Sequence, residues 1–280
     1  MALGAYVAGF PKDASALDSF NRLVGTPARM VMWYEGDETA SFSAATADFV
    51  LAHNATPIIT WDPWGSDPKS IIAGTYDAYM HRYLHAVAVW GKRVYLRPMW
   101  EMNGNWYAWG YGVNGNTAAD LVAAWQHIVD IGREEGASNV RWVWSPNVLP
   151  STGQTWGTPY AQIYPGDSYV DWLGLDGYNS GGAAWRSLLT TFKASYDSIT
   201  ALSAKPLMIA ETASAEQDGD KAVWIAQGLM LDLPTFMPRV RAVTWFNINK
   251  EEDWRVNSSP ASLASFSDVA ASQAFSGVLP

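Results

Sequence analysis

The stretch RVYLRPMWE, residues 93–101, is a run of strand-forming and apolar side chains that ends in one glutamate. Runs rich in β-forming residues recur along the chain, at 5–10, 28–34, 56–61, 93–100, 140–145, 170–176, 206–211 and 240–247. Stretches with helical spacing lie between most of them or follow the last, at 13–24, 43–53, 75–90, 117–135, 184–202, 219–231 and 260–274. Continuous apolar strands that alternate with amphipathic helices indicate a parallel sheet buried on both faces.

This alternation predicts an α/β fold. Eight such units in 280 residues are typical of a (β/α)8 TIM barrel. A doubly wound open sheet is the alternative, but it usually has fewer units and a glycine-rich nucleotide turn, which this sequence lacks. The segment 147–169 is richer in Gly, Pro and Ser, and has room only for a short helix near 159–163. We found no linker or change in composition, so residues 1–280 are expected to form one domain.

The composition excludes several classes of function. The chain has no cysteine, so a disulfide framework, a thiol nucleophile and a cysteine-bound metal are excluded. The net charge of −9 argues against a nucleic-acid partner. No uninterrupted apolar run reaches the roughly 18 residues that a membrane span needs. Sixteen tryptophans and thirteen tyrosines on an acidic chain suit a neutral, flat-faced ligand such as a sugar.

Location and assembly are expectations only. The sequence starts without a basic segment followed by an apolar one, so any export signal has been removed or was never present. We expect an extracellular monomer, with a cytoplasmic location left open.

In a TIM barrel the chemistry lies at the carboxyl ends of the strands. The polar and aromatic candidates at those ends are Tyr34, Glu35, Trp61, Asp62, Glu101, Asn103, Asn147, Asp176, Tyr178, Asn179, Glu211, Trp245 and Asn247. Glu101 and Glu211 each end an apolar run, and strands four and seven would place them across the barrel mouth. Paired carboxylates are what the cleavage of a glycosidic bond requires. The alternative is that each glutamate only pairs with a buried arginine such as Arg97.

Four segments, in order, resemble glycoside hydrolase family 26. They are LRPMWEMNGNWYAWG (96–110), YPGDSYVDWLGLDGYN (164–179), KPLMIAETAS (205–214) and WFNINKEEDWRV (245–256). The resemblance runs from about residue 5 to 275 and implies a retaining endo-acting β-glycosidase that uses two glutamates and no cofactor or metal. It implies β-1,4-mannan as the first substrate, with an endo-β-1,3-1,4-glucanase or a β-1,3-xylanase as alternatives. A catalytically silent barrel that only binds polysaccharide is the alternative outside enzymes.

The resemblance also implies roles for particular residues. Glu101 matches the general acid/base and Glu211 the nucleophile, while Arg97 and Tyr178 match the arginine and tyrosine beside the nucleophile. Trp245 matches the aromatic platform under the cleaved sugar. The remaining residues expected to bind substrate are Trp61, Asp62, Trp100, Asn103, Trp106, Trp109, Asn147 and Asp176. For Trp106 and Trp109 the alternative is loop packing, and for Asp62 it is a turn before Pro63.

The sequence departs from the family at Trp100, where family members usually carry histidine before the acid/base glutamate. An indole has one donor and no acceptor, so it cannot make the polar contacts of histidine. We expect Trp100 to border the cleft and to weaken the preference for mannan; the alternative is packing toward the helices.

Weaker signals lie outside the four segments or at their edges. His81 and His85 stand four apart on an expected helix, but the motif lacks the glutamate of a zinc-protease helix, so a metal role is not expected. Glu35 is expected to be solvated. Trp64 is expected near the cleft, and Trp254 could form one of its walls.

Overall fold

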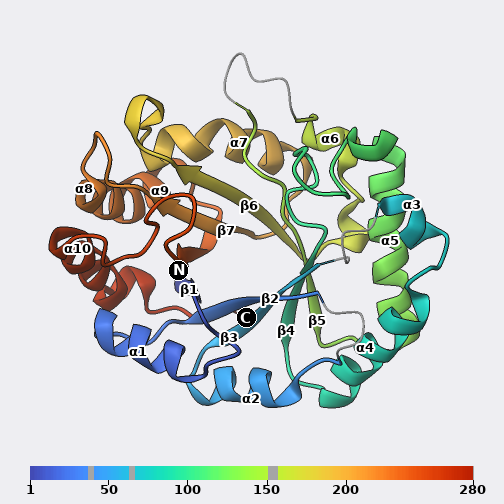
Figure 1. Ribbon diagram of the computed structural model, residues 1–280. Coiled ribbons are helices and arrows are strands. Elements are labelled where there is room, and N and C mark those ends of the chain that lie inside the picture. Colours follow the sequence, from blue (N-terminus) through green and yellow to red (C-terminus); the bar gives the residue numbers. More distant parts are fainter. Residues whose placement is uncertain (37–40, 63–66, 151–156, 280) are drawn as a thin grey trace.

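The computed structural model describes residues 1–36, 41–62, 67–150 and 157–279. Eight parallel strands pair in chain order and close on themselves, β1 with β8, so the predicted (β/α)8 barrel is confirmed (Figure 1). The strands are β1 (Ala2–Val7), β2 (Met30–Glu35), β3 (Thr56–Trp61), β4 (Val94–Pro98), β5 (Val140–Trp144), β6 (Trp172–Asn179), β7 (Leu207–Ser214) and β8 (Val240–Asn247).

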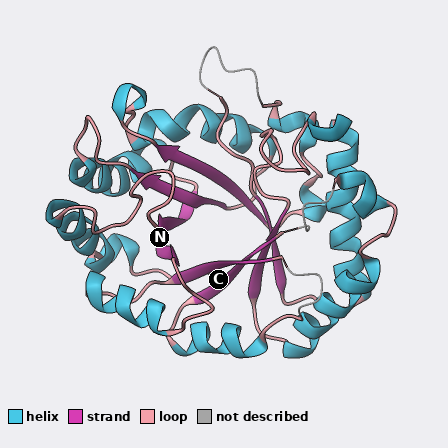
Figure 2. Cartoon of the chain, in the orientation of Figure 1, coloured by secondary structure: helices cyan, strands magenta, loops and turns pink. Residues whose placement is uncertain are grey.

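Helices form a ring outside the strands, as Figure 2 shows. The α-helices are α1 (Ser15–Val24), α2 (Ala44–Ala52), α3 (Pro68–Ile72), α4 (Asp77–Trp90), α5 (Ala118–Glu134), α6 (Tyr160–Ile163), α7 (Leu188–Leu202), α8 (Lys221–Gln227), α9 (Leu233–Phe236) and α10 (Pro260–Ala271). The 3₁₀ turns are η1 (Val113–Gly115), η2 (Asp167–Tyr169), η3 (Gly182–Ala184) and η5 (Gln273–Phe275), and η4 (Gly228–Asp232) is a π-helical turn. Within the described residues, no helix is both long and apolar enough to cross a membrane.

Several predicted elements differ from the structure in their bounds. β1 is Ala2–Val7, three residues before the strand expected over 5–10, and two further differences have reasons visible in the sequence. The helix expected over 219–231 is divided into α8 and the π-turn η4, and α9 follows beyond its expected end. Pro234 has no N–H to donate to the carbonyl four residues earlier, which favours a wider turn at this point. The strand expected over 93–100 ends at Pro98, because Met99 takes a left-handed conformation with φ of 47°.

The ends of β6 and β7 matter most for the site. Both strands continue three residues beyond their expected ends, to Asn179 and Ser214. Their register shifts between Leu175 and Asp176, so that Asp176 pairs with Glu211. Glu211 and Tyr178 are therefore fixed in regular strands and not on loops.

Candidate active site

The carboxyl ends of the strands surround a cavity of about 870 Å³. Glu101 and Glu211 both line it, one from the turn after β4 and the other from β7. Its wall is otherwise rich in aromatic side chains. The other lining residues are Tyr6, Tyr34, Trp106, Tyr107, Asn147, Tyr178, Ser180, Phe246, Ile248, Lys250, Glu251 and Trp254. The fold thus brings two carboxylates into one aromatic-lined space.

Glu211 is 4% exposed and is held by donors on both carboxylate oxygens. Its Oε1 accepts a hydrogen bond from the Tyr34 hydroxyl at 2.6 Å and another from the Arg97 guanidinium. Its Oε2 accepts a hydrogen bond from the Tyr178 hydroxyl at 2.5 Å. An ionised carboxyl group can accept all three bonds, because neither oxygen carries a proton. Arg97 and Tyr178 therefore lie beside Glu211 as expected, and Tyr34 completes the set.

Arg97 is buried beneath Glu211 and is shared with a second carboxylate. Its Nη1 donates to both oxygens of Asp176, at 2.8 and 2.7 Å. Asp176 is fully buried and also accepts a hydrogen bond from Ser145 Oγ at 2.9 Å. The structure corrects the expectation that Asp176 contacts substrate, because its carboxylate faces Arg97 and it is not among the described residues that line the cavity. Asp176 instead supports the cation that holds Glu211.

We expect Asp176→Asn to lower the free energy of unfolding by about 1–3 kcal/mol, because the buried Arg97 loses a charged hydrogen-bond partner and keeps only Glu211. Asp130→Asn is the matched control, since Asp130 pairs with Arg133 where both side chains are 48% exposed. Exposed pairs contribute less than about 1 kcal/mol. Urea unfolding of the two variants and the parent measures the difference. Equal, small losses in both variants would contradict a structural role for Asp176.

Glu101 is 7% exposed and lies in the turn that follows β4. Its φ of 54° is in the left-handed region, where a residue other than glycine is strained by roughly 1 kcal/mol or more. Its N–H donates to the Ser145 carbonyl at 2.7 Å, which fixes the turn against β5. Its carboxylate accepts hydrogen bonds from Trp106 Nε1 at 2.7 Å and from Asn147 Nδ2 at 2.5 Å. Burial, followed by the charge of Glu211, raises the pKa of Glu101 to about 7.

Asn103 and Asn147 form a reciprocal pair behind Glu101. Asn103 Nδ2 donates to the Asn147 carbonyl at 2.9 Å, and the Asn147 N–H donates to Asn103 Oδ1 at 2.8 Å. Asn103 was expected to bind substrate, but it is fully buried and is not among the described residues that line the cavity. It orients Asn147 instead. Asn147 does line the cavity, and its amide reaches Glu101.

Trp100 lies one layer behind the cavity wall. It is 4% exposed, and its ring makes edge contacts with Tyr34 and Tyr107, with centroids 5.4 and 4.9 Å apart. Its Nε1 donates to the Tyr107 hydroxyl at 3.1 Å. Trp100 therefore points neither into the cavity nor toward the helices. It supports two tyrosines that line the cavity and has no polar atom left for a ligand.

The two tryptophans of the following loop have different roles. Trp106 is 42% exposed, lines the cavity and donates to Glu101. Trp109 is 2% exposed and stacks on Tyr107 at 4.4 Å, and its Nε1 donates to the Trp100 carbonyl at 2.8 Å. The loop-packing alternative therefore holds for Trp109 and not for Trp106.

Trp245 does not lie under the cavity. It is fully buried and packs against Trp224 of α8 and Phe266 of α10, on the outer side of the barrel. Successive side chains of a strand point to opposite faces, so the next residue, Phe246, lines the cavity instead. Phe246 stacks on Tyr6 with centroids 4.6 Å apart.

Trp61 and Asp62 also lie away from the cavity, in contrast to the expectation. Trp61 is 1% exposed and stacks on Tyr83 of α4 at 4.7 Å, so it packs between the barrel and that helix. Asp62 is half-buried, with its N–H donating to the Glu35 carbonyl at 2.8 Å, and is not among the described residues of the cavity wall. Trp64 falls outside the described residues.

Comparison with known proteins decides the family. The sequence model described as "Glycosyl hydrolase family 26" matches residues 43–259. The chain belongs to this family. It is therefore a glycoside hydrolase.

Relatives of this family 26 chain carry several names. Endoglucanase H of Acetivibrio thermocellus is 40% identical over 272 residues, which cover 94% of the chain and 30% of that protein. β-1,3-Xylanase TXYA of a Vibrio species is 25% identical over 186 residues, 62% of the chain and 38% of that protein. The chain thus spans well under half the length of these relatives. The catalytic domain of the Bacillus sp. JAMB-750 GH26 endo-β-1,4-mannanase is 19% identical, has a TM-score of 0.73 and shares the fold over 98% of this chain and 86% of that one.

Several residues of the family 26 cavity were not predicted from the sequence. Tyr6 lies outside the four segments, and Tyr107 and Phe246 lie inside two of them without having been selected as site residues. Tyr34 was a strand-end candidate, but its contact with Glu211 depends on how β2 and β7 face each other across the barrel. Trp254 forms part of the wall as expected and packs on Tyr178 at 5.2 Å.

Two other signals have structural explanations. Glu35 is half-buried and hydrogen-bonded, in contrast to the expectation that it is solvated. It accepts hydrogen bonds from Trp33 Nε1 at 2.7 Å and from the Tyr83 hydroxyl, and burial raises its pKa. His81 and His85 both direct Nδ1 at Glu135, at 2.7 and 3.0 Å. In the parts of the chain that the structure describes, no group of three or more potential ligands is arranged for a metal ion.

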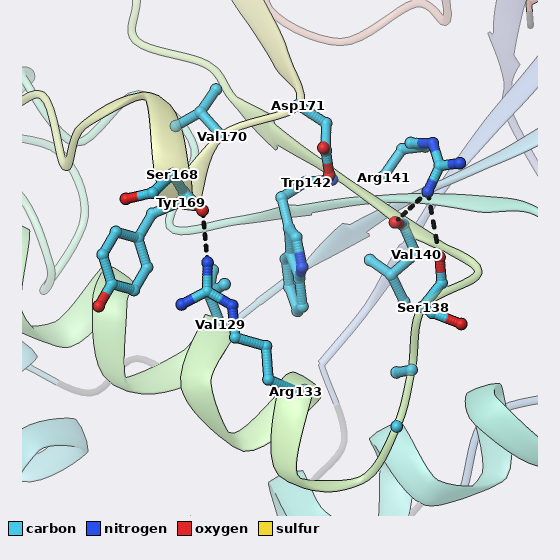
Figure 3. A pocket seen from close by; sticks show the side chains of 13 residues that line it. Val129, Arg133, Ser138, Val140, Arg141, Trp142, Ser168, Tyr169, Val170 and Asp171 are labelled. Carbon is cyan, nitrogen blue, oxygen red and sulfur yellow. Dashed lines mark hydrogen bonds between the residues drawn. The ribbon is translucent and has the colours of Figure 1, made fainter.

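A further hollow of about 340 Å³ lies at the opposite, amino ends of β5 and β6 (Figure 3). Its two arginines are already engaged with backbone carbonyls, Arg133 with Ser168 and Arg141 with Ser138 and Val140. In a TIM barrel this end serves stability, so we assign the hollow no part in the chemistry.

Proposed function

We propose that the chain is a retaining, endo-acting β-glycanase with Glu101 as acid/base and Glu211 as nucleophile. One observation carries the proposal: two carboxylates line the same cavity in opposite environments. Burial raises the pKa of Glu101, whereas Glu211 accepts bonds from Arg97, Tyr34 and Tyr178. Two carboxylates with different protonation states are what a retaining glycosidase requires.

The first step breaks the glycosidic bond. Glu211 attacks the anomeric carbon while Glu101 gives its proton to the leaving oxygen, which yields a covalent glycosyl-enzyme and a free chain end. Ester formation removes the charge of Glu211, which is one of the causes of the raised pKa of Glu101. Glu101 then ionises more readily and takes a proton from water, whose oxygen displaces Glu211 with net retention.

The substrate that we favour is a β-linked glucan. The relative that matches 94% of the chain is named an endoglucanase, whereas mannosidases match it over shorter lengths, for example 122 and 137 residues. Trp100 lies behind the cavity wall and donates its N–H to Tyr107, so it favours neither polymer over the other.

β-1,4-Mannan is the second candidate. Proteins named mannan endo-1,4-β-mannosidase are 30% identical to the chain over those segments, and one from Caldalkalibacillus mannanilyticus is 34% identical over 94 residues. The similarity of these segments supports a mannan substrate.

A panel digestion tests the proposal. Mixed-linkage β-1,3-1,4-glucan, β-1,4-glucan, β-1,4-mannan and β-1,3-xylan are incubated separately with the protein, and the early products are analysed by size and by NMR of the new anomeric centre. We expect oligosaccharides of several lengths from the mixed-linkage glucan, with retained β configuration. Release of single sugars only would contradict endo action, and α products would contradict the retaining mechanism. Turnover of mannan alone would make the second candidate correct.

The pH dependence follows from the state of Glu101, which must be protonated to cleave the bond. Because its pKa is raised to about 7, we expect kcat/KM to fall about tenfold per pH unit above that value. The Trp106 hydrogen bond favours the ionised form, so Trp106→Phe should move this alkaline limb to higher pH. Initial rates across pH for the two proteins measure the shift. An unmoved limb would show that Glu101 does not set it.

Trp100→His tests the residue at which the sequence leaves its family. Trp100 packs behind Tyr34 and Tyr107, so its loss should loosen both and cost roughly 2–4 kcal/mol of stability. We expect activity on glucan and mannan to fall by similar factors, with a lower Tm. A changed preference between the two polymers at unchanged Tm would instead give position 100 a direct part in sugar recognition.

A further inference from the structure

A separate hollow of about 230 Å³ lies outside the ring of strands, between the start of α7 and one face of α8 and η4. We call it the α7–α8 hollow. The residues that define it are Trp185, Asp220, Trp224, Gln227, Gly228 and Asp232. Because α7 and α8 begin after the carboxyl ends of β6 and β7, its Trp185 and Asp220 edge lies at the same end of the barrel as the catalytic cavity (Figure 1).

Trp185 gives the hollow a flat apolar surface. Its indole lies directly on the backbone of Gly219, where an added Cβ would come within 2.2 Å of the ring. Only glycine permits that approach, so the ring is held in one position. Trp185 is half-buried and lines the hollow, so the part of the ring that Gly219 does not cover faces the open space. Flat, fixed aromatic surfaces of this kind suit the apolar face of a sugar.

Asp232 gives the hollow an unused acceptor. It lines the hollow at 6% exposure, and within the described residues no hydrogen bond or ion pair reaches its carboxylate. This carboxylate faces the open hollow, so an occupant of the hollow can donate hydrogen bonds to it. The π-turn η4, which ends at Asp232, places it there, and such turns frequently occur at functional sites.

The remaining lining indicates a neutral ligand. Asp220 and the amide of Gln227 add polar groups along the same face of α8, and none of the described lining residues is a lysine or arginine. Two carboxylates disfavour an anion, whereas sugar hydroxyls can donate to both. The volume is below the usual range for drug-sized ligands, about 300–1,000 Å³, so one or two sugar units fit.

We propose that the α7–α8 hollow is a second carbohydrate-binding site, which holds another part of the polysaccharide that the catalytic cavity cleaves. The choice of ligand rests on the proposed function. A polymer attached at both places is retained by effective concentration, so binding here raises activity on long chains and leaves cleavage of short ones unaffected.

Affinity electrophoresis tests the site without catalysis. Native gels that contain mixed-linkage β-glucan or β-mannan are run with Glu211→Ala, which leaves the polymer intact, and with the same protein carrying Trp185→Ala. We expect the second change to weaken the affinity for one polymer by roughly fivefold or more. Trp90→Ala is the matched control: Trp90 is a half-buried tryptophan of α4 that packs near Lys92, away from the hollow, and its loss should leave the affinity unchanged.

Asp232→Ala separates binding from folding. Because its carboxylate has no described partner, its removal should weaken polymer affinity without lowering the free energy of unfolding. Unchanged affinity in both hollow variants, or no retardation by any polymer, would overturn the inference. If the parent cleaves a polymer and the Trp185→Ala and Asp232→Ala variants still bind it with full affinity, the second binding site is disproved and the proposed function stands. If retardation depends on Trp185 but no polymer is cleaved, only the proposed function fails.

Discussion

Glu211→Ala should reduce turnover of every polysaccharide substrate by roughly 10⁴–10⁶-fold, the scale on which the loss of a catalytic nucleophile acts. Glu211 Oε1 and Oε2 are held by Arg97, Tyr34 and Tyr178, and no described carboxylate other than Glu101 and Glu251 lines the cavity. Alanine leaves no atom to form the glycosyl-enzyme. Initial rates on polymer and on an activated aryl glycoside should both fall, because the leaving group does not affect the need for a nucleophile.

Folding must survive the change for this result to be meaningful. Arg97 keeps both bonds to Asp176 when Glu211 is removed, so its charge remains paired. Glu134→Ala is the matched control, since Glu134 is 66% exposed on α5 and should leave kcat within about twofold. Residual activity of Glu211→Ala near the parent level would show that another group is the nucleophile.

The sequence was sufficient for the barrel and for the two carboxylates. Alternating apolar strands and helices predicted the barrel, and Glu101 and Glu211 each end an apolar run of the sequence at the carboxyl side of the barrel, where the strand ends meet. The sequence pattern could not predict which of two adjacent residues in a strand faces the cavity. Phe246 and not Trp245 does so, because successive side chains of β8 point to opposite faces and Trp245 packs against Trp224 and Phe266 outside the barrel.

The directions of the side chains that follow β4 could not be predicted from the sequence for a related reason. Met99 and Glu101 both have positive φ, so the chain turns sharply after Pro98 and strand alternation no longer applies. Trp100 therefore lies behind Tyr34 and Tyr107, a position that neither predicted orientation describes. Long-range pairings such as Arg97 with Asp176 are likewise set by barrel closure and not by any local pattern.

Glu101→Ala should separate the two chemical steps. Polymers have poor leaving groups that need a proton, so their turnover should fall by roughly 10²–10⁴-fold. An aryl glycoside with an acidic phenol leaves without that proton, so it should still form the glycosyl-enzyme and then stall, because no base activates water. We expect phenol to be released in a burst equal to the enzyme concentration and then slowly.

Azide then identifies which glutamate has which role. As an anion that needs no base, azide should enter the space vacated by Glu101 and attack the stalled intermediate, which restores turnover and gives a glycosyl azide of retained β configuration. Trp106 and Asn147 both donate to the parent carboxylate, so they are left to receive the incoming anion. Glu134→Ala, treated in the same way, should show no response to azide. If instead Glu211→Ala is rescued with retained configuration, the nucleophile is Glu101 and the two assignments exchange.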